Sequence, residues 1–320
     1  MRLIGKSGID LHRVENDTPD DERNVLVHEE KTYILRDLVE GKPRSKGGNS
    51  TVYTLHDPAG IDFAIKISRV YGPLKSITRG YRQRYGRFMA EIEALQKCSE
   101  GGCESVVQIL GEGTVTVEGR EFPYYIMEKA QFDLKEFLLR NLDVDDQNRV
   151  ELCFGVHRAI QQLHDMGYYH RDIKPDNILF FGSSSNDEEE NPTWKIGDLG
   201  LIEARNKDNL DRTGERIGPF GWISPEAGNK FMTEEYSIGL DCTIDEKSDV
   251  FQLGKLMWFI FQNNIPIGII ERADLTRDFP HADQAFSTVF RALQHSKTRR
   301  YDMEQMGRDL QALASAYGVA

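Results

Sequence analysis

The stretch that decides the fold of this chain is Tyr169-His170-Arg171-Asp172-Ile173-Lys174-Pro175-Asp176-Asn177-Ile178-Leu179. Asp172 could accept the proton of an acceptor hydroxyl, and the side-chain oxygen of Asn177 could bind Mg²⁺, a combination that suits phosphoryl transfer. Lys174 could neutralise the transferred phosphate. The alternative is a polar loop in which Arg171 and Asp172 merely form a salt bridge. Because five fixed identities at this spacing arise by chance at roughly one position in a million, the pattern favours the chemical interpretation.

The composition narrows the class of protein. The chain has 320 residues, with 40 Lys and Arg against 52 Asp and Glu, so its net charge is -12 and its pI is near 5.2. This balance disfavours a nucleic-acid-binding face, and any anion site must be local. The four cysteines have no C-x-x-C spacing, and the best apolar run, 256–261, is far too short to cross a membrane. We therefore expect a cytoplasmic protein with reduced thiols that binds neither nucleic acid nor membrane; the sequence does not indicate an oligomeric state.

Two kinds of pattern follow one another along the chain. Short β-type segments, separated by glycines, are expected at 33–39, 50–55, 63–67, 106–110 and 124–127. One helix, at about 81–98, interrupts them, because its apolar residues recur at three- and four-residue spacing. Further helices are expected at 134–139, 150–165, 250–261, 286–293 and 303–314. The chain is thus predicted to have a β-rich half followed by an α-rich half, and the acidic loop 182–192 is assigned no chemistry.

A glycine-containing stretch, residues 45–53, lies between two predicted strands. Gly47 and Gly48 would let backbone N–H groups approach phosphate oxygens without a Cβ in the way. A hairpin turn with no ligand explains these glycines equally well. A Walker-type phosphate loop is excluded, because the one Gly-Lys-Ser, at 5–7, has no room for the glycine required five positions before Gly5.

Lys66 is the one charged residue in the apolar segment 63–67. A strand with two buried faces keeps a lysine only beside a partner, and Glu91, on the apolar face of the following helix, is the natural one. The alternatives are an edge-strand lysine that points at water and a solvated glutamate. Asp198, in the segment 195–200, would add a second hard oxygen ligand to the amide oxygen of Asn177, as Mg²⁺ accepts when phosphates and water supply the rest.

Taken in this order, the residues resemble the eukaryotic-type protein kinase family, from about residue 33 to the last helix. The resemblance implies an α+β, bilobal fold with a small antiparallel β-sheet and one main helix in the N-lobe and a mainly helical C-lobe. It divides the chain into an N-terminal extension at 1–30, an N-lobe at 31–130 and a C-lobe at 131–320, which together form one kinase domain.

The resemblance also implies ATP and Mg²⁺ as cofactors. Lys66, paired to Glu91, would contact the α- and β-phosphates, and Asp172 would be the catalytic base. Lys174 would neutralise phosphate and mark serine/threonine specificity. The metal ligands would be Asn177 and Asp198. The residues implied to bind ATP are Gly47, Gly48, Asn49, Ser50, Val52, Ala64, Lys66, the gatekeeper Met127, Glu128 and Ala130 of the hinge, and Asp133 near the ribose.

Several landmarks agree with the resemblance and some residues depart from it. Residues 221–226 resemble the family's A-P-E segment with serine in the first place, so Arg300 would pair with Glu226. Asp249 would anchor the catalytic loop from the helix below. Two serines, Ser45 and Ser50, replace loop glycines, and Leu199 replaces a phenylalanine. Pro219 replaces the threonine that contacts the catalytic aspartate, which puts the substrate platform and the serine/threonine specificity in question.

The resemblance implies an ATP- and Mg²⁺-dependent kinase that phosphorylates Ser and Thr of protein substrates and can autophosphorylate. One alternative is a catalytically silent kinase-like scaffold, favoured by Pro219 and the serine-substituted loop. Another is a small-molecule kinase of the aminoglycoside or choline type, but those kinases lack the segment ending at Glu226 and the Asp249 anchor.

Arg171, directly before Asp172, indicates two possible forms of control. A phosphate on Thr213 could pair with the Arg171 guanidinium. Alternatively, one of the nearby carboxylates already satisfies this arginine and the enzyme is constitutively active; the candidates are Asp208, Asp211 and Glu215.

Overall fold

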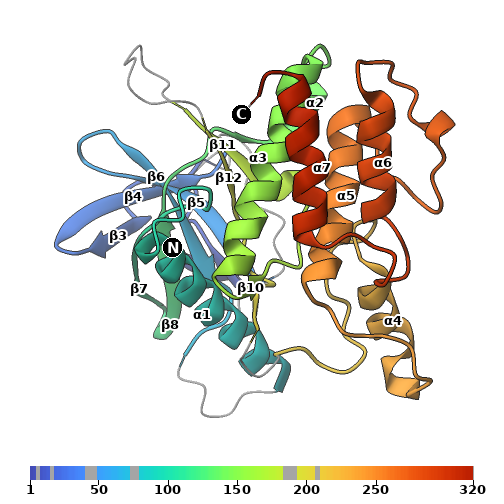
Figure 1. Cartoon of the computed structure of the whole chain (residues 1–320). Helices are drawn as coiled ribbons and strands as arrows, with labels where there is room; N and C mark the ends of the chain where they lie inside the picture. Colours follow the sequence, from blue (N-terminus) through green and yellow to red (C-terminus); the bar gives the residue numbers. More distant parts are fainter. Residues whose placement is uncertain are drawn as a thin grey trace. The chain divides into compact units, whose positions relative to one another are not determined.

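The computed structural model describes residues 1–4, 8–14, 18–39, 49–72, 79–182, 193–205 and 210–319 (Figure 1). Its packing divides the chain into two compact units. Unit 1 comprises Met1–Gly101 and Val107–Ala130, and unit 2 comprises Gly102–Val106 and Gln131–Ala320.

Unit 1 is built on a six-stranded antiparallel sheet in the order β3-β4-β5-β6-β8-β7. Its strands are β3 (Val25–His28), β4 (Lys31–Asp37), β5 (Ser50–His56), β6 (Asp62–Ser68), β7 (Ile109–Val117) and β8 (Arg120–Met127). The sheet confirms the predicted fold class. The strand expected at 106–110 begins only at Ile109, because Val106 belongs to unit 2 and bridges Ile196 there.

The two faces of this sheet are covered differently, because successive side chains of a strand point to opposite faces. The face that carries Lys66 is tied to helix α1 (Arg79–Glu100) by the ion pair with Glu91. The opposite face belongs to an apolar cluster to which the N-terminal segment contributes Ile9, Leu11 and Leu26, and the sheet contributes Tyr53, Leu55, Ile65, Ile67, Tyr124 and Ile126. The sheet therefore has a buried core on the face away from Lys66.

The described parts of residues 1–30, a segment for which the sequence indicated no role, belong to this packing. They supply β3 and a two-stranded hairpin of β1 (Arg2–Ile4) and β2 (Gly8–Asp10). Arg13 forms a buried ion pair with Asp37 of β4 at 2.8 Å, and the Tyr53 hydroxyl donates to the Ile9 carbonyl at 3.2 Å. The segment is thus attached to the sheet by both polar and apolar contacts.

Unit 2 is mainly helical. Its helices are α2 (Leu134–Arg140), α3 (Asp146–Asp165), α4 (Pro225–Thr233), α5 (Glu246–Gln262), α6 (Ala282–Ala292) and α7 (Met303–Ala316). Helix α5 is buried along most of its length, and α3, α6 and α7 pack around it (Figure 1). The helices predicted for this half are all present, with ends shifted by a few residues. Helix α4 was not predicted, although Ser224 and Pro225 are typical N-cap and N1 residues.

Short strands and turns complete unit 2 and carry the loops of interest. A three-stranded sheet has the order β12 (Thr193–Ile196), β11 (Ile178–Phe181), β9 (Phe132–Asp133), and β10 (Tyr168–Tyr169) pairs with β13 (Glu203–Ala204). The 3₁₀ turns in the described part of unit 2 are η2 (Pro175–Asn177), η3 (Glu234–Tyr236) and η4 (Arg272–Asp274). The decisive stretch 169–179 therefore runs from β10 through η2 into β11.

Candidate active site

In unit 1, Lys66 and Glu91 form the expected ion pair. Lys66 Nζ donates to Glu91 Oε1 at 2.7 Å, and the two residues are 6% and 1% exposed. Strand β6 lies between β5 and β8, so Lys66 is not on an edge strand, and the interpretation of a lysine that points at water is wrong. A buried lysine and a buried glutamate offset each other's loss of hydration only when they pair closely, as here.

Several of the residues expected to bind ATP share the face of the sheet that carries Lys66. Val52 is the β5 residue opposite Lys66, and Met127 of β8 is opposite Ala64. Because Ala64 precedes Lys66 by two positions in β6, all four side chains point to the same face. The structure thus brings Val52, Ala64 and Met127 together with Lys66.

The other expected ATP-binding residues of unit 1 lie at or beyond the ends of strands, or outside the described residues. Gly47 and Gly48 lie outside the described residues, as does Ser45. Asn49 accepts the Arg69 N–H through its backbone oxygen at 2.9 Å, and Ser50 is the first residue of β5. Figure 1 shows β5, which begins at Ser50. Glu128 accepts the Gln108 N–H at 2.7 Å, and Ala130 is half-buried at the end of unit 1.

Asp133, expected near the ribose, belongs to unit 2 and is the N-cap of α2. Its Oδ1 accepts the Glu136 N–H at 2.8 Å. Burial raises the pKa of Asp133 above its ordinary value, although the capping hydrogen bond lowers it. The cap fixes the carboxylate, which is therefore positioned before any ligand arrives.

Three residues of the decisive stretch converge in unit 2. Lys174 Nζ donates to both carboxylate oxygens of Asp172, at 2.9 and 3.1 Å. Asn177 Nδ2 donates to the Asp172 backbone oxygen at 2.8 Å and to Oδ2 at 3.0 Å. The 3₁₀ turn η2 allows this, since it folds the chain back so that Asn177 meets Asp172. The NH₂ group of Asn177 thus donates to Asp172, and the side-chain oxygen Oδ1 of Asn177 is the atom that could bind a cation.

Asp198 lies beside this cluster. Strand pairing of Ile178 with Ile196 and the hydrogen bond from Gly197 N–H to the Asn177 carbonyl at 2.9 Å place Asp198 at the same end of the β11–β12 hairpin as Asn177. Its side chain is exposed, and its backbone adopts a left-handed φ of 53°. For a residue other than glycine this conformation is strained, and such strain is typical of functional sites.

The charges of the cluster fit a divalent cation. Burial raises the pKa of Asp172, Lys174 lowers it and Asp198 raises it, so that the pKa lies above its ordinary value. Two carboxylates and one ammonium leave negative charge that Mg²⁺ would offset. Within the described residues, no group of three or more His, Cys, Asp or Glu side chains could hold a metal. Mg²⁺ bound by Asn177 Oδ1 and Asp198 would therefore take its other ligands from phosphates and water.

Helix α5 holds the backbone of the stretch 169–179 through side-chain hydrogen bonds. Asp249, fully buried, accepts the N–H groups of His170 and Arg171 and the His164 ring Nε2, each at 2.8 Å. Burial by itself would raise the pKa of Asp249, but the hydrogen bond and charge of His164 lower it below its ordinary value. The expected anchor is therefore present, and it holds a backbone that includes Arg171 at a left-handed φ of 68°.

Sequence reasoning missed a second side chain of α5 that holds this backbone. Gln252, three residues after Asp249 on the same helix, accepts the Ile173 N–H at 2.9 Å and donates to the Arg171 carbonyl at 3.1 Å. The spacing of three residues on one helix face was the only signal in the sequence. The two side chains hold the backbone on both sides of Asp172.

The Arg171 side chain is already paired. Its Nη2 donates to both oxygens of Asp211, at 2.7 and 2.8 Å, and its Nη1 donates to Glu203. The side chains of Arg171 and Asp211 are each 2% exposed. Burial raises the pKa of Glu203, Arg171 lowers it and Asp211 raises it, with the net direction upward.

Of the two described carboxylates considered for Arg171, Asp211 is bonded to it. Glu215 instead accepts the Arg212 N–H, and Asp208 lies outside the described residues. Thr213, the expected phosphorylation site, is exposed. The pairing of Arg171 favours the hypothesis of a carboxylate that satisfies the arginine.

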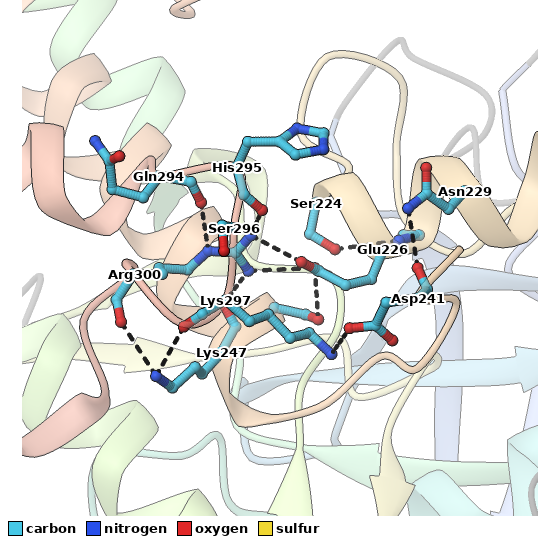
Figure 2. A network of polar contacts seen from close by, with 12 residues as sticks. Ser224, Glu226, Asn229, Asp241, Lys247, Gln294, His295, Ser296, Lys297 and Arg300 are labelled. Atoms are coloured by element: carbon cyan, nitrogen blue, oxygen red, sulfur yellow. Dashed lines mark hydrogen bonds and ion pairs between the residues drawn. The ribbon is translucent and has the colours of Figure 1, made fainter. Parts of the chain in front are cut away.

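Glu226 and Arg300 form the expected buried pair in unit 2. Arg300 Nη2 donates to Glu226 Oε1 at 2.8 Å and Nη1 donates to Oε2 at 3.2 Å. Arg300 also donates to the backbone carbonyls of Gln294, His295 and Lys247 (Figure 2). Burial by itself would raise the pKa of Glu226. The hydrogen bond and the charge of Arg300 outweigh this effect, so the pKa of Glu226 lies below its ordinary value.

The segment expected to form the substrate platform has its own backbone turn. Pro219, where the family has threonine, accepts the Trp222 N–H through its carbonyl at 3.0 Å. The preceding Gly218 has a φ of 95°, and a Cβ there would lie 3.4 Å from the Arg171 carbonyl. The left-handed φ therefore favours glycine here, and the turn lies within van der Waals distance of the Arg171 backbone. Phe220, the next residue after Pro219, is 85% exposed.

None of the helices in the described part of the chain has the length and apolarity needed to cross a lipid bilayer.

Comparison with known proteins agrees with this geometry. The sequence model of the protein kinase domain matches residues 45–315. The chain is 29% identical over 255 residues to a G-type lectin S-receptor-like serine/threonine-protein kinase of Arabidopsis thaliana, which covers 78% of this chain and 25% of that protein. It is 27% identical over 294 residues to the serine/threonine-protein kinase PknL of Mycobacterium tuberculosis, with 87% of this chain and 66% of that protein covered.

A further relative is the probable serine/threonine-protein kinase PknB of Corynebacterium glutamicum, 25% identical over 240 residues that cover 73% of this chain and 33% of that protein. The chain therefore spans between about a quarter and about two thirds of the length of these relatives. Because the domain match covers most of the chain, from the glycine-containing stretch to α7, this chain belongs to the protein kinase family.

Proposed function

We propose that this chain is an ATP- and Mg²⁺-dependent serine/threonine-protein kinase that transfers the γ-phosphate to hydroxyls of protein substrates and to its own. The observation that carries the proposal is the convergence of Lys174 and Asn177 on Asp172, with Asp198 at the same end of the β11–β12 hairpin. The relatives named above are serine/threonine-protein kinases, which supports the acceptor class.

Each residue has a role that follows from its chemistry. Asp172 aligns the acceptor hydroxyl and receives its proton; its raised pKa makes it a better proton acceptor than an ordinary carboxylate. Lys174 offsets charge on the transferred phosphoryl group, and Lys66, held by Glu91, contacts the α- and β-phosphates. When bound by Asn177 and Asp198, Mg²⁺ would neutralise charge on the β- and γ-phosphates.

The adenosine part of ATP is assigned to the sheet face that carries Lys66. Val52, Ala64 and Met127 offer apolar area on that face, and Glu128 and Ala130 continue the chain beyond it. Asp133 is proposed to contact the ribose, and Gly47, Gly48, Asn49 and Ser50 to cover the phosphates.

The same proposal includes the cytoplasm as the compartment, because the chain carries its four cysteines as thiols. Its partners are protein substrates, without nucleic acid or membrane. The departure at Pro219 lies in the substrate platform, and the residues of the phosphoryl-transfer cluster are all present.

The test is incubation with Mg²⁺, γ-labelled ATP and generic protein acceptors, with Asp172→Asn as the control variant. Label on the chain and on Ser or Thr of the acceptors, lost in Asp172→Asn, is expected. If the wild-type chain labels no protein and no small molecule, the chain is a catalytically silent kinase-like scaffold instead. Label on an added aminoglycoside or choline, but not on protein, would identify a small-molecule kinase instead.

A further inference from the structure

Tyr125 contacts the ion pair of unit 1, although sequence analysis gave it no role. In the register of β6 and β8, Tyr125 is directly opposite Lys66. The residue is 1% exposed, and its hydroxyl donates to Glu91 Oε1 at 3.0 Å. The same oxygen accepts Lys66 Nζ at 2.7 Å. Glu91 on α1 is therefore held by donors from two neighbouring strands.

The ring of Tyr125 is itself fixed. Its centroid lies 5.7 Å from that of Phe88, which precedes Glu91 on α1 by three residues and so lies on the same helix face. Lys66 Nζ lies 5.9 Å from the Tyr125 centroid. The ring thus contacts both α1 and Lys66, and its hydroxyl has little freedom to turn elsewhere.

A buried carboxylate depends strongly on its donors. Glu91 is 1% exposed, so a lost hydrogen bond cannot be replaced by bulk water. A hydrogen bond to a charged group is stronger than one between neutral groups, and two donors on one oxygen define the direction of the carboxylate. Removal of the hydroxyl takes away one of the donors that orient Glu91, and any shift of Glu91 would move the Lys66 ammonium that is paired with it.

We infer that Tyr125 is a positioning residue for phosphoryl transfer: its hydroxyl orients Glu91, and Glu91 in turn holds Lys66 where the phosphates of ATP bind. The inference rests on the proposed function for its effect on catalysis. The contact between Tyr125 and Glu91 does not depend on that function.

The first experiment compares Tyr125→Phe with Tyr124→Phe. Tyr124 is the adjacent residue of β8, points to the opposite face and bonds His28 Nδ1 at 2.9 Å, so its substitution removes a buried hydroxyl away from Lys66. We expect Tyr125→Phe to lower kcat about tenfold, as for a lost hydrogen bond to a charged group, with KM for ATP changed less than about twofold. Tyr124→Phe should leave kcat unchanged. Equal kcat values in wild type and Tyr125→Phe would overturn the inference.

A double-mutant cycle separates positioning from a general loss of packing. If Tyr125 acts through Glu91, then Tyr125→Phe costs nothing more in a Glu91→Ala background, where the acceptor of the hydroxyl is gone. If the double variant loses the same factor again relative to Glu91→Ala, the hydroxyl acts independently of Glu91 and the inference is wrong.

Hydrogen exchange on the protein without ATP provides a readout that needs no activity. We expect faster backbone exchange around Glu91 in α1 for Tyr125→Phe, and wild-type exchange there for Tyr124→Phe. If the wild-type chain transfers no phosphate, the proposed function fails by that result, and the exchange data then decide whether Tyr125 holds Glu91. Wild-type exchange in Tyr125→Phe would overturn the contact itself.

Discussion

Asp249 Oδ1 accepts the backbone N–H of Arg171 at 2.8 Å, although the two residues lie 78 positions apart in the chain. The bond joins α5, the most buried helix of unit 2, to the residue that directly precedes Asp172. Because Arg171 has a left-handed φ, its conformation is unfavourable by itself and depends on such outside support. The position of Asp172, the proposed catalytic base, is thus determined through its backbone.

This relationship predicts the effect of Asp249→Asn. An asparagine keeps one acceptor oxygen but turns an NH₂ group toward a backbone N–H, which leaves a buried donor without an acceptor. We expect the free energy of unfolding to fall by about 1–3 kcal/mol and the transfer rate to fall as well. Denaturant unfolding and the labelled-ATP assay measure both. Asp283→Asn, at a side chain that is 91% exposed, is the control and should change neither. An Asp249→Asn variant with wild-type stability would contradict this account of the loop.

The proposed phosphate and metal contacts predict that Lys66→Ala or Asp198→Ala abolishes phosphoryl transfer while the chain remains folded. Lys66 would no longer contact the phosphates, and Asp198 would no longer bind Mg²⁺. Circular dichroism checks the fold, and the labelled-ATP assay checks transfer. The matched control is Lys97→Ala, which breaks the exposed pair with Glu93 on α1 and should transfer at the wild-type rate. Undiminished transfer in either test variant would overturn the assignment of that residue.

The pairing of Arg171 with Asp211 predicts activity without phosphorylation of Thr213. Thr213→Ala should keep the wild-type rate, and mass spectrometry should find the active protein unmodified at Thr213. Asp211→Asn removes a buried charge opposite Arg171 and should lower the rate about tenfold. Glu215→Gln, at a carboxylate that serves the Arg212 N–H, is the control. A rate that depends on phosphate at Thr213 would favour the phosphate switch instead.

The Glu226–Arg300 pair predicts a pH-dependent contribution to stability. Because the pKa of Glu226 lies below its ordinary value of 4.5, its contribution is fully present above about pH 4.5 and is lost as the pH falls through the folded-state pKa. Glu226→Gln should lower the free energy of unfolding by about 3 kcal/mol at pH 7, and the difference from wild type should shrink at lower pH. Glu304→Gln, which breaks an exposed pair with Arg308, should show little difference at any pH. A difference that does not change with pH would refute this role of the Glu226 charge.

The packing of residues 1–30 predicts that they stabilise unit 1. Leu11 is fully buried in the cluster on the sheet face opposite Lys66, so Leu11→Ala should cost about 2–5 kcal/mol of unfolding free energy. Val14→Ala, at a residue that is 52% exposed, should change it by no more than about 0.5 kcal/mol. Denaturant unfolding, followed by a probe in unit 1, measures both. Equal stabilities of the two variants would show that the N-terminal segment adds nothing to the fold.

The sequence by itself determined the type of chemistry and the types of element. Asp172, Lys174 and Asn177 lie within six residues, so one local turn brings them together and their spacing reveals them. The helices of unit 2 were also predictable, because apolar periodicity is a local property. Among the long-range pairs, Lys66–Glu91 was expected from a lysine in an apolar strand and a glutamate on the apolar face of the next helix, whereas Glu226–Arg300 was expected only from the resemblance to a known family. The structure shows both.

Only the tertiary structure determined which side chains contact Glu91 and Arg171. Tyr124 and Tyr125 look alike in the sequence, and the strand register alone turns one hydroxyl toward His28 and the other toward Glu91. Likewise, Asp211 and Glu215 are equivalent candidates for Arg171 until the loop that carries them is folded. The physical reason is that such contacts join residues 34 and 40 positions apart, where no local periodicity or propensity acts and only the packing of the chain determines the distance.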